Sequence, residues 1–159
     1  GLKGVVAVHS WIVFKRKDAK SWTRYDVVGW GNPVRMNGWA PDGRWYGTAP
    51  TVVADVRGEK AQAMIPAVEK AVKEYRYANA GDYRLWPGPN SNSFVADILR
   101  AVPQSGAISA PAPMPAGPTA APGWKPVSTA SSASRPDGWK AWRSTFSVWL
   151  QASISAIRR

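Results

Sequence analysis

The sequence predicts an α+β fold in which an antiparallel β meander packs against two helices. Its first third alternates runs rich in β-branched and aromatic residues with dense Gly, Pro and Asn turns, a pattern typical of short strands. Two amphipathic helical patterns follow, at residues 58–75 and from Asn90 or Ser91 to about Val102. At 159 residues, 45% of them hydrophobic, the chain is long enough for one ordinary domain with a real core.

The strand expected at residues 4–14 is apolar on both faces, which favours a central position in the sheet. A charged turn separates it from a second strand at 21–30. Turn signals then bracket two short strands, around residues 34–36 and 44–46.

The first predicted helix buries one apolar stripe, and Pro66 inside it predicts a kink or a restart. That stripe consists of Met64, Ile65, Val68, Val72 and Tyr75. The second helix ends at Pro103 and turns Phe94, Val95, Ile98 and Leu99 to the core.

The composition changes after Pro103, so the domain is assigned to residues 1–103. Residues 104–136 are rich in Pro, Ala, Ser and Gly, which is typical of a linker. Residues 137–159 predict a basic amphipathic helix with an apolar stripe at helical spacing. We expect this helix either to bind an anionic membrane surface or a protein partner, or to pack on the domain. The stripe consists of Trp139, Trp142, Phe146, Trp149, Leu150, Ile154 and Ile157.

The composition of residues 104–159 leaves a second interpretation open. The bias toward Ala, Pro, Ser, Trp and Arg is also what an out-of-frame ending of a GC-rich gene would produce.

The net charge of +11 favours an anionic partner, although an excess of solvated Lys and Arg on the surface explains it equally well. Residues 1–103 carry 15 basic and 9 acidic residues, and residues 104–159 carry six and one. Nucleic acid is a less favoured partner, because the tryptophans could stack on bases but no recognition motif is present.

Several kinds of chemistry are disfavoured by composition. The chain has no cysteine, which excludes disulfides and thiolate catalysis. One histidine and ten scattered carboxylates offer no ligand spacing for a metal, and no glycine-rich phosphate loop indicates a nucleotide cofactor. We therefore expect no cofactor, and no segment is suited to span a bilayer.

The single histidine, His9, lies mid-strand and is the first candidate catalytic residue. If the following turn is centred between Lys17 and Asp18, His9 faces Asp26 across the hairpin. Such a carboxylate would hold the imidazole tautomer and stabilise the imidazolium. A one-residue shift would bring Tyr25 or Val27 opposite instead, and the Tyr25 hydroxyl could also orient the ring.

Ser91 is the candidate nucleophile, because it lies at the start of the second predicted helix. Backbone N–H groups and a positive dipole at a helix start stabilise an anion there. Asn90 or Asn92 could add an amide donor, and His9 would be the general base. The alternatives without catalysis are that Asn90 and Ser91 only cap the helix and that His9 is a hydrogen-bonded core residue.

Five segments resemble an uncharacterised bacterial family of unknown function over residues 4–103. They are Val8-His9-Ser10-Trp11-Ile12, Tyr25-Asp26-Val27-Val28-Gly29-Trp30-Gly31, Asp42-Gly43-Arg44-Trp45-Tyr46-Gly47, Ala54-Asp55-Val56-Arg57-Gly58 and Trp86-Pro87-Gly88-Pro89-Asn90-Ser91-Asn92-Ser93-Phe94. The segment at residues 89–94 is also similar to the Asn-Cys-Asn-His-Phe motif of the circularly permuted papain-like superfamily, which includes lecithin:retinol acyltransferase-like proteins and permuted NlpC-type amidases. Trp11 and Trp86 in these segments are, with Asn90 and Asn92, the candidate ligand-binding residues.

The resemblance implies a hydrolase or acyltransferase of amide or ester bonds, acting on an acyl, peptide or glycan ligand. It favours the bacterial cell envelope or periplasm over the cytoplasm. However, Ser91 stands where that superfamily has cysteine, and a serine hydroxyl cannot form the thiolate–imidazolium pair. The chain is then either a serine-type enzyme on a papain-like frame or a catalytically inactive binding domain.

Overall fold

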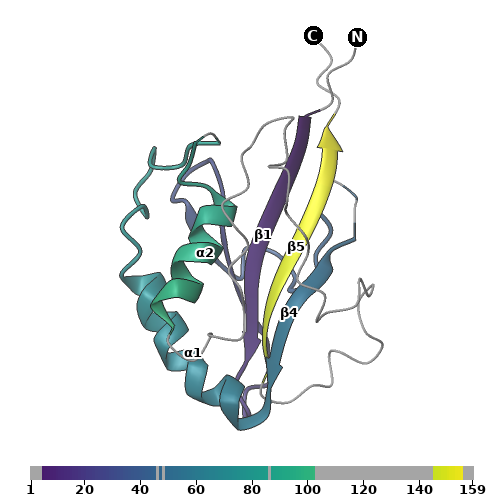
Figure 1. Cartoon of the computed structure of the whole chain (residues 1–159), viewed down its shortest axis with the longest axis vertical. Helices are drawn as coiled ribbons and strands as arrows, with labels where there is room; N and C mark the ends of the chain where they lie inside the picture. The colour runs from purple at the N-terminus through teal and green to yellow at the C-terminus, as the bar shows by residue number, and fades with distance from the viewer. Residues whose placement is uncertain (1–4, 46, 48, 86, 103–144, 156–159) are drawn as a thin grey trace.

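The computed structural model describes residues 5–45, 47, 49–85, 87–102 and 145–155. Its strands form one antiparallel sheet in the order β3-β2-β1-β5-β4, and two helices cover one face of it (Figure 1). The predicted α+β class is confirmed. The elements are β1 (Val5–Lys15), β2 (Thr23–Val27), β3 (Val34–Met36), β4 (Thr51–Arg57), α1 (Gly58–Lys73), α2 (Ser91–Ala101) and β5 (Thr145–Ser155).

β1 is the central strand, as its two apolar faces predict. Ile12 and Phe14 point to the helices and join the main core, whereas Trp11 and Val13 belong to a smaller apolar cluster on the other face. Successive side chains of a strand alternate between faces, so β1 divides the molecule into a helix side and an open side, by which we mean the face that α1 and α2 do not cover. The helices contribute Ala61, Met64, Ile65, Val68, Val72, Phe94, Val95, Ile98 and Leu99 to the main core.

The predicted meander is confirmed only for β1, β2 and β3. The second strand is shorter than expected, because the turn with positive-φ Gly31 begins soon after Val27. The strand expected around residues 44–46 is wrong for its described residues, Arg44 and Trp45, where Trp45 forms only an isolated bridge. β4 was not predicted.

Both helices of the domain lie where the sequence predicts them. α1 does not restart at Pro66, which lies inside one continuous helix. α2 begins directly after Asn90 and ends next to Val102.

The helix predicted at residues 137–159 is wrong for its described part, because Thr145–Ser155 is the strand β5. β5 lies between β1 and β4 and pairs with both. Its sequence also alternates apolar Phe146, Val148 and Leu150 with other residues, which is the period of a strand. Residues 104–136, together with Trp139 and Trp142, lie outside the described residues.

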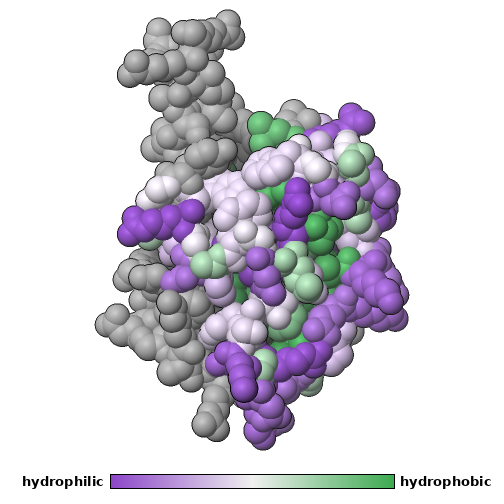
Figure 2. Space-filling model, turned by 180° about the vertical axis from the view of Figure 1, so that it is seen from behind, coloured by the Kyte–Doolittle hydropathy of each residue, from purple (hydrophilic) through white to green (hydrophobic). Residues whose placement is uncertain are grey.

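No helix in the described ranges is long and apolar enough to cross a membrane. The face seen in Figure 2 is hydrophilic along its right and lower margins, with paler and hydrophobic residues towards its middle and at its top.

Candidate active site

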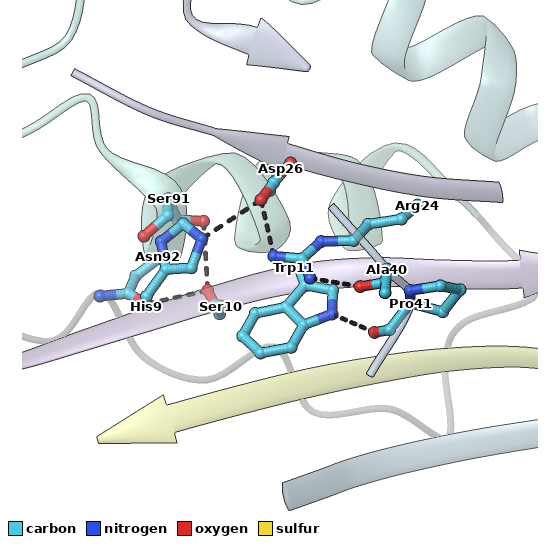
Figure 3. Close-up of polar contacts among 9 residues, drawn as sticks. All are labelled: His9, Ser10, Trp11, Arg24, Asp26, Ala40, Pro41, Ser91 and Asn92. Atoms are coloured by element: carbon cyan, nitrogen blue, oxygen red, sulfur yellow. Dashed lines mark hydrogen bonds and ion pairs between the residues drawn. The ribbon is translucent and has the colours of Figure 1, made fainter. Parts of the chain in front are cut away.

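His9 is buried on the open side of the sheet and contacts Asp26. The distance from His9 Nε2 to Asp26 Oδ2 is 3.4 Å (Figure 3). The predicted hairpin register is wrong by two residues, because Ile12 pairs with Tyr25, which places Asp26 diagonally from His9. An error of two residues leaves every side chain on its predicted face, so the expected His–Asp pair forms nevertheless.

Arg24 is a third member of this buried cluster that the sequence analysis missed. Its Nη2 donates to Asp26 Oδ2 at 2.8 Å, and its Nη1 donates to the carbonyl of Ala40 at 2.8 Å. Burial lowers the pKa of the Arg24 guanidinium, and the charge of Asp26 opposes this effect. The sequence did contain a signal for Arg24, because Arg24 and Asp26 are two residues apart on one strand and therefore share a face. Because Arg24 and Asp26 form an ion pair, their two charges cancel with no contribution from His9.

Aromatic rings enclose this cluster. Trp45 stacks on the His9 ring with centroids 4.2 Å apart and planes 16° apart. Trp11 is fully buried, lies under the Arg24 guanidinium at 4.2 Å, and donates from Nε1 to the carbonyl of Pro41 at 3.0 Å. The predicted ligand-binding residue Trp11 therefore supports the cluster from inside.

The start of α2 is capped by Asn90, as the sequence predicts. Asn90 Oδ1 accepts from the N–H groups of Asn92 and Ser93, and Ser93 Oγ accepts from the N–H of Asn90, which completes a capping box. The Asn90 amide nitrogen donates to the carbonyl of Leu85. The cap does not engage the N–H of Ser91, the first residue of α2.

The start of α2 is hydrogen-bonded to β1 on both sides of His9. Ser10 Oγ lies 2.8 Å from Asn92 Oδ1 and 3.2 Å from the carbonyl oxygen of Ser91. Asn92 Nδ2 donates to the carbonyl of Val8 at 3.1 Å. The fold thus brings the segments of His9 and Ser91 together from opposite ends of the domain (Figure 3).

Ser91 is 2% exposed. Among the described residues, no hydrogen bond joins Ser91 Oγ to the His9 ring. The strand alternation explains this, because Ser10 faces α2 and His9 turns to the open side.

Among the remaining predicted site residues, Tyr25 lies apart from this group. Tyr25 is on the helix side, where its ring packs near Phe14 and its hydroxyl donates to Met36 Sδ at 3.3 Å. Burial, with a smaller contribution from Glu69, raises the pKa of Tyr25. Trp86 lies outside the described residues.

Phe146 and Trp149, two of the residues predicted to contact a membrane or a partner, lie on β5. Phe146 is fully buried in the main core, so it is not an exposed anchor for a membrane or a partner. Trp149 is a backbone partner of Trp11 in the sheet. Within the described part of the chain, no group of three or more His, Asp or Glu side chains could hold a metal ion.

Comparison with known families now adds to this geometry. The sequence model of one family, described as "Protein of unknown function (DUF3750)", matches residues 1–112. The chain belongs to this family. The resemblance to a family of unknown function is thereby confirmed. Neither the curated proteins nor the solved structures include a match to this DUF3750 chain.

Proposed function

We propose that this DUF3750 protein is a serine-type hydrolase or acyltransferase of amide or ester bonds on a permuted papain-like frame. One observation carries the proposal: the His9–Asp26 pair lies beside a helix start that is hydrogen-bonded to both neighbours of His9. Base, orienting carboxylate and hydroxyl then come from β1, β2 and α2, three elements that pack together.

In the proposed reaction, Ser91 Oγ attacks the carbonyl carbon of the substrate, and its proton passes to His9 through a bridging water, because the two side chains are not directly hydrogen-bonded. Because Nε2 faces Asp26, Nδ1 is the ring nitrogen that takes this proton. The N–H of Ser91, at the positive end of α2, stabilises the oxyanion. The imidazolium returns the proton to the leaving group, and water or another acceptor then removes the acyl group from Ser91.

Labelling with a fluorophosphonate tests the proposal on the full chain. We expect Ser91 to be modified, the Ser91→Ala variant to lose labelling, and His9→Ala to react about 10²–10⁴-fold more slowly. Ser21→Ala, which removes an exposed hydroxyl, is the matched control. Absence of labelling in the wild-type protein, or equal labelling of Ser91→Ala, contradicts the proposal.

A catalytically inactive papain-like binding domain is the second candidate. It is favoured by the burial of Ser91 and by the 2.8 Å ion pair in which Arg24 already engages Asp26. Titration with octanoate, an acetylated dipeptide and chitobiose, read by tryptophan fluorescence, distinguishes the two. Binding of one probe equally to wild-type and His9→Ala protein, without turnover of its ester or amide, supports the binding domain.

A further inference from the structure

β5 occupies a slot between two strands that come from the other end of the sequence. It pairs with β1 along its whole length, from Lys15↔Thr145 to Val5↔Ser155. It also pairs with β4 from Thr145 to Leu150. Among the described strands, β5 is the one that joins β4 to the rest of the sheet (Figure 1).

Both walls of this slot lie inside the DUF3750 region, whereas the strand that fills it does not. The family match ends at residue 112, and β5 begins at Thr145. Residues 102–144 separate α2 from β5 in the sequence. The matched region therefore supplies an incomplete sheet.

We propose that β1 and β4 form a strand-accepting site, and that residues 145–155 are a ligand strand that this site binds also as a separate polypeptide. The inference is independent of the catalytic proposal. Its chemistry is that of β-augmentation, in which backbone hydrogen bonds give affinity and the side-chain alternation gives register.

Binding of a strand between β1 and β4 is favourable for two reasons. Without β5, the N–H and C=O groups of β1 that face it would lose their partners, and such an edge pairs readily with another strand. Phe146 and Thr145 of β5 are both 0% exposed, so the strand also completes the core. Affinity thus comes from both the backbone and an aromatic anchor.

The register of the incoming strand is specified on the β4 side by an irregularity. β5 residues Val148 and Trp149 pair with Ala54 and Val52, so Val53 is passed over. A bulge of this kind pins the register, because a slipped strand would not match it.

A cleavable full-length chain tests the proposal. A site-specific protease sequence is placed between Pro118 and Gly123, and the cut protein is unfolded in urea and refolded with a fluorescent peptide of residues 145–155. We expect the peptide to enter the cut protein and displace the native C-terminal fragment. The uncut chain should take up at least about 10-fold less peptide, because its own strand is present at millimolar effective concentration.

The matched control peptide carries Val148→Pro, which removes a backbone donor in mid-strand and should abolish uptake. Fluorescence anisotropy and native mass spectrometry give the stoichiometry, expected to be one peptide per cut protein. Three results would overturn the proposal: no uptake of the native peptide, equal uptake of the proline peptide, or loss of the C-terminal fragment with an unchanged circular dichroism spectrum.

Discussion

Arg24 is fully buried, with its guanidinium 4.2 Å from the Trp11 ring and 5.7 Å from the Trp39 ring and its charge matched by Asp26. Replacing it with an apolar side chain leaves a buried carboxylate without its cation. Arg24→Met should lower the free energy of unfolding by about 3–5 kcal/mol, measured by urea denaturation. The double variant Arg24→Met/Asp26→Leu should lose less than Arg24→Met alone, because no buried charge then remains. A greater loss in the double variant would show that the pair is not the source of the effect.

Ionisation of the Tyr75 hydroxyl makes the free energy of unfolding depend on pH in the alkaline range. Burial raises the pKa of its hydroxyl from 10.0 to about 12, and the charge of Asp97 adds to this. The folded protein then keeps a proton that the unfolded chain releases, so the free energy of unfolding falls as pH rises from about 10 to 12. The loss attributable to Tyr75 should reach about 2–3 kcal/mol at the upper end.

Urea denaturation between pH 9 and pH 12 measures this loss. Tyr75→Phe should flatten the profile relative to the wild-type protein. Identical slopes for Tyr75→Phe and the wild-type protein would contradict the assignment.

At the level of elements, three hydrogen bonds join β1 and α2 in the described structure, and two of them use the side chain of Asn92. Ser10→Ala and Asn92→Ala should each cost about 1–3 kcal/mol of unfolding free energy, because each leaves a partly or fully buried polar group unsatisfied. A double-mutant cycle should give a coupling energy of about 0.5–3 kcal/mol. Additive effects would mean that Ser10 and Asn92 act separately.

Element prediction succeeded where one periodicity was dominant. β1 has two apolar faces and α2 has a strong cap at Asn90, so both were correctly assigned. Thr145–Ser155 fits both a helical stripe and a strand alternation, and local sequence does not decide between them. Pairing with β1 and β4 decides it, because a strand in that slot satisfies their backbone groups.

At the scale of the whole molecule, β5 makes the far C-terminal part of the chain share a core with the first hundred residues. Phe146 of β5 is the register partner of Phe14 on the neighbouring strand β1, and it is fully buried. Phe146→Ala should lower the free energy of unfolding by about 3–5 kcal/mol, while exposed Leu85→Ala should change it by less than about 0.5 kcal/mol.

Unfolding followed by circular dichroism and by tryptophan fluorescence should give one coincident urea transition for both variants. Two separate transitions would show that β5 unfolds independently of the domain.

The sequence by itself determined the α+β class, the central strand, the capped helix start at Asn90 and the faces on which His9 and Asp26 lie. These follow from local periodicity and capping chemistry, which act within a few residues. Only the tertiary structure decided that Arg24 shares Asp26 with His9, that Ser10 rather than His9 hydrogen-bonds to the start of α2, and that β5 is a strand. Each of these depends on which remote segment of the chain lies next to the residue concerned. The local sequence pattern does not specify which remote segments pair.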